Sequence, residues 1–352
     1  MTNGLIEDLQ SISPGETAVA VATLVSATGS TSKKVGTKMV VGGSGRLLGG
    51  VTIGGCVDAQ VVEAADALIA SGGRRVLSIS LDDDEAWEIG LTCGGNVDVL
   101  IEHVNVRDDV DPVVSAQAAA RAVLARGEVA VVATPLDGGS AALVIGADGT
   151  RHGSLGGVAL DAAATTIAED VLRSASRVEA IELEGVTHRV FFDRQAPPTT
   201  IVIVGAGQIA MSLTRMAREL GIQTIVVDGR DRYATRERFP DADEIRVGMP
   251  SEIIASIAPT QRTAFVLIAH DYKYELPALR LLLRSKAGYV GMLGSKKRGE
   301  AVRALLRDEG YTDDELARIH TPIGLDIGGK SPPEVALSIL AELVAVRSGK
   351  RA

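Results

Sequence analysis

The sequence predicts an α/β protein with two domains, and three observations support this prediction. After residue 199, short apolar runs alternate with helical segments up to residue 349, which is typical of a doubly wound parallel sheet. Pro197 and Pro198 precede the first run and predict a linker, because proline favours extended backbone and is excluded from central strands. Over residues 1–196 a pattern of strands, glycine turn and helix occurs twice, which predicts an α+β domain with an internal repeat.

The composition limits the possible partners. The chain has 352 residues, a net charge of −9 and only 3% aromatic residues. An acidic chain with few aromatic residues offers neither a basic surface for the phosphates nor rings on which bases could stack, so we expect no nucleic-acid partner. No apolar run is long enough for stable membrane insertion. Two cysteines cannot form a disulfide framework, and the N-terminus lacks a basic segment followed by an apolar one, so the sequence predicts a cytoplasmic protein without a signal peptide.

The two copies of the N-terminal repeat span about 17–104 and 128–193. Residues 19–23 match 130–134, and a Gly-Gly pair then precedes a predicted helix in both copies. Each copy is predicted to form two strands, a glycine turn, a helix and further strands. The first copy carries about nine extra residues, which we assign to 27–36.

Both cysteines lie in glycine turns of the first copy. Cys56 precedes a predicted helix over 57–70, and the second copy has Val158 in place of Cys56 and Glu184 near the place of Cys93. A helix N-terminus stabilises a thiolate, so the pattern predicts functional thiols. The alternative is that each cysteine is a small buried hydrophobic residue. The candidate binding residues of this region are Gly54, Gly55, Cys56, Cys93 and Gly94.

The C-terminal domain is predicted to contain six strands joined by helices. Helix starts are indicated by Ser295, by a capping box of Thr312 with Glu315, and by Ser331 followed by proline and Glu334. The predicted strands are 200–204, 222–227, 243–247, 263–269, 288–293 and 321–325.

A glycine-rich turn follows the first of these strands. Gly205 and Gly207 open a G-x-G-x-x-A motif that continues into a helix through Gln208, which is the Rossmann-like arrangement for a pyrophosphate. Asp228 ends the next strand, where an acidic residue typically accepts a hydrogen bond from a ribose hydroxyl. The motif predicts a nucleotide-type ligand, and the alternative is a Rossmann fold that has lost its ligand.

Two further candidates lie where later strands end. His270 follows the fourth strand and is either a proton-transfer or ligand-contacting group, or else a helix cap or a buried neutral histidine. Ser295 opens a helix whose first turn holds the cations 296–298, which either bind a ligand or form a solvated basic turn. The loop 29–34, with Lys38 nearby, is either an anion site or a mobile surface loop. The other four histidines have no ligand spacing with the cysteines, so no protein-built zinc site is expected.

These motifs in combination resemble the XdhC/CoxI family, whose members are accessory factors for the maturation of xanthine dehydrogenase and carbon monoxide dehydrogenase. The resemblance covers nearly the whole chain and is weakest between about 105 and 195. The loop 30–35 departs from the family, which usually has a proline and an arginine there. The matching segments are 54–57, 90–95, 205–207, 270–274, 289–295 and 319–328.

The resemblance implies a protein that binds the molybdenum cofactor, as molybdopterin or its cytosine dinucleotide. It also implies help with sulfuration by a cysteine desulfurase and delivery to the apo large subunit of a molybdenum hydroxylase. Such a protein is a cofactor-insertion chaperone more than a catalyst. We expect a pyrophosphate at 205–207 and the molybdenum end near Cys56 and Cys93, because thiols suit a soft, sulfur-rich metal centre.

Two other functions stay open from the sequence. One is an NAD(P)- or FAD-dependent oxidoreductase that uses the C-terminal domain, and the other is a docking adaptor without a cofactor. A homodimer is an open possibility for the assembly.

Overall fold

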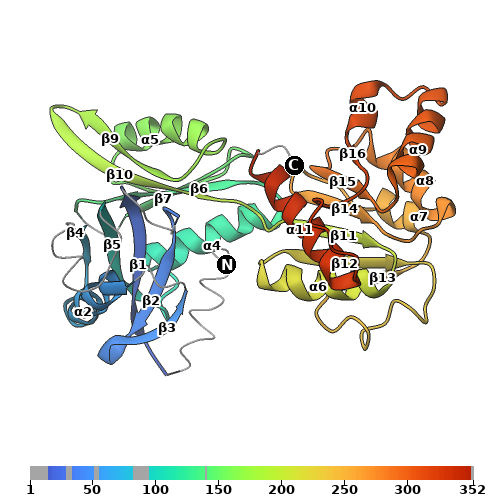
Figure 1. Ribbon diagram of the computed structural model, residues 1–352. Helices are drawn as coiled ribbons and strands as arrows, with labels where there is room; N and C mark the ends of the chain where they lie inside the picture. The colour runs from blue at the N-terminus through green and yellow to red at the C-terminus, as the bar shows by residue number, and fades with distance from the viewer. Residues whose placement is uncertain (1–14, 29–33, 51–54, 82–94, 139–140, 350–352) are drawn as a thin grey trace. The chain divides into compact units, whose positions relative to one another are not determined.

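The computed structural model describes residues 15–28, 34–50, 55–81, 95–138 and 141–349 (Figure 1). The chain forms two compact units, Met1–Pro197 and Pro198–Ala352, and each is described here by itself. Within the described residues, no helix is long and apolar enough to span a membrane.

The N-terminal unit contains two five-stranded sheets with the same strand order. The first sheet has the order β3-β2-β1-β5-β4 and the second the order β8-β7-β6-β10-β9. The strands of the first copy are β1 (Ala18–Ala27), β2 (Lys38–Gly42), β3 (Arg46–Gly50), β4 (Arg74–Leu81) and β5 (Gly95–Asn105). Those of the second copy are β6 (Ala130–Pro135), β7 (Ala142–Gly146), β8 (Arg151–Ser154), β9 (Arg177–Leu183) and β10 (Val186–Gln195).

The strand registers show which residues of the two copies correspond. Val21 of β1 lies opposite Glu102, and its counterpart Val132 of β6 lies opposite Asp193. Glu102 and Asp193 are therefore equivalent positions. The copies differ in the connection between their last two strands, which is 82–94 in the first copy and only two residues, 184–185, in the second.

One helix covers the outer face of each sheet, and a third helix lies against the inner faces. Helix α2 (Gly55–Ser71) packs on Ala20, Ala22 and Leu24, whereas the alternate residues Val19 and Val21 contact Val114 of α4 (Pro112–Ala125). This follows from the two-residue period of a strand. Helix α5 (Val158–Val171) covers the second sheet in the same way, and α4 also packs on that sheet's inner face.

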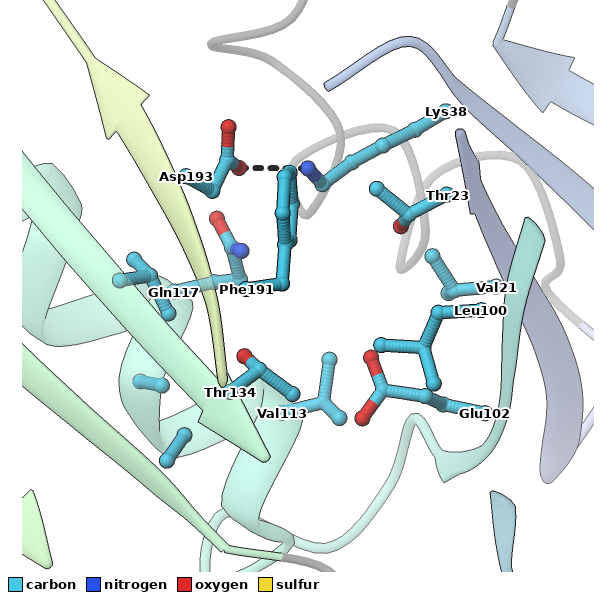
Figure 2. A pocket seen from close by; sticks show the side chains of 13 residues that line it. Val21, Thr23, Lys38, Leu100, Glu102, Val113, Gln117, Thr134, Phe191 and Asp193 are labelled. Carbon is cyan, nitrogen blue, oxygen red and sulfur yellow. Dashed lines mark hydrogen bonds and ion pairs between the residues drawn. The ribbon is translucent and has the colours of Figure 1, made fainter. Parts of the chain in front are cut away.

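The inner faces enclose a small cavity beside α4, lined by apolar side chains and a few polar ones (Figure 2). Its volume is about 30 Å³, which leaves room for one or two water molecules but not for a cofactor. Lys38 reaches across this cavity and bonds to Asp193 of the second copy at 2.6 Å, with both side chains about nine-tenths buried. The ammonium of Lys38 is thus held inside the protein, which rules out its suggested role in an exposed anion site.

A second buried ion pair lies in the first copy, and its arginine also bonds to the second copy. Arg74 bonds to Glu102 at 2.9 Å and donates to the carbonyls of Pro135 and Ala141 in the second copy, at 2.6 and 3.3 Å. Burial raises the pKa of Glu102, against the opposing charges of Arg74 and Lys38. Each of the two equivalent carboxyl groups therefore faces a cation that ties one copy to the other.

The C-terminal unit is a six-stranded parallel sheet with the order β13-β12-β11-β14-β15-β16. Helices α6 and α11 pack on one face, and α7, α8, α9 and α10 contribute to the core on the other. The strands are β11 (Thr200–Val204), β12 (Gln223–Asp228), β13 (Glu244–Val247), β14 (Thr263–Leu267), β15 (Tyr289–Met292) and β16 (Ile319–His320). The helices are α6 (Gln208–Glu219), α7 (Pro250–Ala255), α8 (Tyr272–Leu282), α9 (Lys296–Asp308), α10 (Asp313–Ala317) and α11 (Pro332–Arg347).

The predicted fold class is confirmed: a doubly wound parallel sheet follows an N-terminal part built on antiparallel sheets. Ser295, Thr312 and Ser331 lie at the N-caps of α9, α10 and α11 as predicted. The predicted position of the sixth strand, residues 321–325, is wrong. The strand is Ile319–His320, and it stops before Pro322, which has no N–H to donate to a sheet.

Candidate functional site

The ends of β11, β12, β14 and β15 lie at one edge of the C-terminal sheet, because parallel strands share their direction. The sheet order reverses between β11 and β14, which is where doubly wound folds bind ligands. This edge brings together six of the predicted site residues, namely Gly205, Gly207, Gln208, Asp228, His270 and Ser295.

The glycine turn follows β11 directly. Gly205 has a φ of +117°, and a Cβ there would lie 2.8 Å from the Cα and N atoms of Ala269. Gly207 is the N-cap of α6, has no capping side chain, and has open space where a Cβ would lie. Gly207 and Gln208 are exposed, so the first turn of α6 is accessible to a ligand. The turn therefore needs its first glycine for the fold, and its second leaves room for another molecule.

Asp228 is buried, with 1% of its surface exposed, and its carboxylate is fully engaged. One oxygen accepts the N–H of Ala206 at 2.7 Å and a guanidinium bond from Arg230 at 2.8 Å. The other accepts the backbone N–H and the Nε–H of Arg230, at 3.0 and 2.8 Å. Burial opposes the charge of Asp228, but the hydrogen bonds from Arg230 and Ala206 outweigh it and lower the pKa. The predicted ribose acceptor is thus already satisfied by the protein.

His270 is exposed after β14 and has a φ of +55°, which is uncommon outside glycine. It is neither buried nor the helix cap, since Asp271 is the N-cap of α8. Its Nδ1 lies 3.2 Å from Nη1 of Arg298. A guanidinium only donates, so Nδ1 accepts and a neutral imidazole carries its proton on Nε2. This arrangement presents His270 as a hydrogen-bond donor.

Glu275 bonds to both His270 and Arg298 and fixes their arrangement. Its carboxyl is fully buried, accepts the N–H of His270 at 3.0 Å and pairs with Arg298 at 2.5 Å. Arg298 also stacks over Tyr272 at 4.6 Å. The hydroxyl of Ser295, a predicted binding group, accepts the N–H of Arg298 as the cap of α9. Sequence reasoning missed Glu275, because an acidic residue in a first helical turn looks like an ordinary dipole interaction.

The buried position of Glu275 predicts a pH dependence of stability. Burial raises its pKa from 4.5 to about 7, although the charge of Arg298 opposes the rise. Between pH 4.5 and about 7, the folded state therefore keeps a proton on Glu275 that the unfolded state has lost. The resulting stabilisation is complete below pH 4.5 and is lost as the pH rises through 7. Glu275→Gln should remove a slope of up to about 1.4 kcal/mol per pH unit. Hydrogen exchange of β14 and α8, followed by mass spectrometry between about pH 4.5 and 7.5, measures it. The exposed Glu300→Gln is the control, and equal slopes for both variants would contradict the prediction.

The cysteine candidates belong to the N-terminal unit. Gly55 and Cys56 are the first two residues of α2, and the side chain of Cys56 lies outside the described residues, as do Gly54, Cys93 and Gly94. The second copy shows the equivalent places: Val158 is 88% exposed, and Glu184 lines a hollow of about 610 Å³. Among the described residues, no cluster of histidine, cysteine and carboxylate side chains could hold a metal ion.

Comparisons with known proteins cover both units. Residues 201–343 match the model of the XdhC Rossmann domain, and residues 15–80 match that of the XdhC and CoxI family. The chain is 25% identical over 351 residues to a probable xanthine dehydrogenase subunit of Bacillus subtilis (strain 168), covering 99% of this chain and 96% of that protein. It is 26% identical over 341 residues to the molybdenum cofactor insertion chaperone PaoD of Escherichia coli (strain K12), covering 96% and 86%.

A solved structure shares the fold. The crystal structure of a protein described as a xanthine dehydrogenase from Bacillus halodurans matches with a TM-score of 0.78 at 23% identity, over 100% of this chain and 97% of that one. This protein belongs to the XdhC and CoxI family, because family models match both units and the relatives extend over nearly the whole chain.

Proposed function

We propose that the protein is a cytoplasmic accessory factor that carries the molybdenum cofactor as cargo to a molybdenum hydroxylase. The observation that carries this proposal is the similarity to a molybdenum cofactor insertion chaperone over 96% of the chain. We further propose that the cargo is held while a cysteine desulfurase installs its terminal sulfur, and is then passed to the apo large subunit.

The two thiols are the proposed contacts for molybdenum. Cys56 lies in the first turn of the 17-residue helix α2, where the helix dipole favours a thiolate. The exposure of Val158 in the second copy supports an accessible place for Cys56, which argues against a buried hydrophobic role. Thiolate is also a ligand of the soft type that a sulfur-rich metal centre prefers.

The C-terminal unit is proposed to bind a nucleotide-type ligand at the glycine turn. Candidates are the cytosine dinucleotide form of the cofactor, NAD(P) and FAD. The accessible first turn of α6 supports a phosphate there, because its N–H groups have no capping side chain.

Loss of both thiols tests the molybdenum contact. We expect the double variant Cys56→Ala, Cys93→Ala, purified from cells that make molybdopterin, to lose nearly all bound molybdenum while its circular dichroism stays unchanged. The measurement is the molybdenum-to-protein ratio by mass spectrometry. The matched control is Val158→Ala with Glu184→Ala, which changes the corresponding places of the second copy and should keep the metal. Full molybdenum content in the cysteine variant would disprove the contact.

Delivery is tested separately from binding. The loaded protein should restore activity to a molybdenum-free hydroxylase large subunit, and should do so only after sulfuration by a cysteine desulfurase. Oxidation of NADH or NADPH by the same protein in the presence of an electron acceptor tests the alternative of an oxidoreductase.

A further inference from the structure

At the end of β12 it is Arg230, rather than Asp228, that offers polar atoms to a ligand. Asp228 uses the Nε–H and one Nη2 proton of Arg230, and among the described residues Nη1 has no hydrogen-bond partner. The side chain of Arg230 is 49% exposed, whereas that of Asp228 is 1% exposed. A ligand at this place therefore meets N–H donors instead of a carboxylate acceptor.

A second arginine lies near Arg230 and contacts the glycine turn. Its guanidinium lies over the exposed ring of Tyr233 at 4.1 Å, which leaves little freedom to the side chain. Arg238 lies over the same ring at 5.4 Å and donates to the carbonyl of Ala206 in the turn at 3.1 Å. Arg230 and Arg238 thus place two guanidinium groups beside the glycine turn.

The chemistry of these donors selects the ligand. A free ribose diol is recognised through an acceptor, and Asp228 has no acceptor position left for it. A guanidinium held by stacking binds a phosphate dianion through charge-assisted hydrogen bonds. In folds of this kind, the end of the second strand faces the 2′ position of the ribose.

We propose that this edge of the C-terminal sheet binds a nucleotide with a 2′-phosphorylated ribose, of the NADPH class, with Arg230 as the specificity-determining residue. The proposal rests on the nucleotide role proposed above for the glycine turn. It narrows that role, because NADH and the cytosine dinucleotide both carry a free diol at the ribose.

The test compares two nucleotides of equal phosphate number. We expect the full chain to bind 2′,5′-ADP at least about tenfold more tightly than ADP in isothermal titration calorimetry. NADPH should likewise bind more tightly than NADH when binding is followed by nicotinamide fluorescence. This comparison needs no variant, so it does not depend on the folding of a mutant.

Variants assign the preference to one side chain. Arg230→Met should bring the affinity ratio of the two nucleotides close to one, because it removes the phosphate donor and frees Asp228 for a diol. Arg232→Met changes an exposed arginine of the same loop and should leave the ratio unchanged.

Equal affinities in the wild-type protein, or an unchanged ratio in Arg230→Met, would overturn this proposal alone. If neither nucleotide bound at millimolar concentration, both this proposal and the proposed nucleotide role of the glycine turn would be disproved. The molybdenum content of the cysteine variants is measured independently and would stand in either case.

Discussion

Gly205→Ala should destabilise the C-terminal unit by about 2–5 kcal/mol, because two penalties act at one atom. The φ of +117° is strained for any residue with a Cβ. That Cβ would also lie 2.8 Å from backbone atoms of Ala269, which cannot move without shifting β14 and His270. Urea unfolding of the full chain, with hydrogen exchange to localise the loss to 198–352, measures the effect.

Gly207→Ala is the matched control two residues away. Gly207 has a φ of −89° and nothing within 4 Å of the added Cβ, so this variant should fold normally. If the turn receives a phosphate, Gly207→Ala should nevertheless weaken nucleotide binding, because the methyl group occupies the ligand's space. A stable Gly205→Ala protein would show that the turn tolerates a side chain and that its glycine is not required by the fold.

The C-terminal fold was predictable because its signals are local. The central strands β11 and β14 are apolar runs, and the helix starts at Ser295, Thr312 and Ser331 are capping residues in sequence. The glycine turn needs only Gly205 and its neighbours. The sixth strand was misplaced because apolar content alone does not reveal where pairing ends, and Pro322, which has no N–H to donate, lies inside the predicted run.

The site was predictable in its place but not in its chemistry. The edge of the sheet follows from strand direction, so Gly205, Asp228 and His270 come together as expected. Whether Asp228 is free depends on the rotamer of Arg230, and the tautomer of His270 depends on Arg298, which is 28 residues away. The rotamers that form these pairs are set by tertiary packing, which a sequence motif does not reveal.

The same limit applies to the ion pair that joins the two copies of the N-terminal repeat. Lys38 and Asp193 are 155 residues apart, and the repeat comparison matches Asp193 only with Glu102. The second copy begins β7 with Ala142 where the first begins β2 with Lys38. The second copy therefore has no lysine of its own at this position, and Asp193 pairs with the lysine of the first copy.

Lys38→Met should therefore destabilise the N-terminal unit by about 3–5 kcal/mol, because it leaves the buried carboxylate of Asp193 without its cation. Ser176 and Gln195 also bond to Asp193, at 3.4 and 3.2 Å, but neither carries charge. Urea unfolding of the full chain measures the loss, with hydrogen exchange of β2 and β10 to localise it.

Adding Asp193→Leu to Lys38→Met should restore most of the lost stability, since a buried ion pair replaced by apolar residues of similar volume is often neutral. Arg46→Met is the control: its pair with Glu16 has the arginine side chain 63% exposed, so it should cost at most about 1 kcal/mol. A loss in Lys38→Met no greater than that of the control would mean that Asp193 is neutralised by another route. A double variant as unstable as the single one would mean that Lys38 acts through its packing between the two sheets and not through its charge.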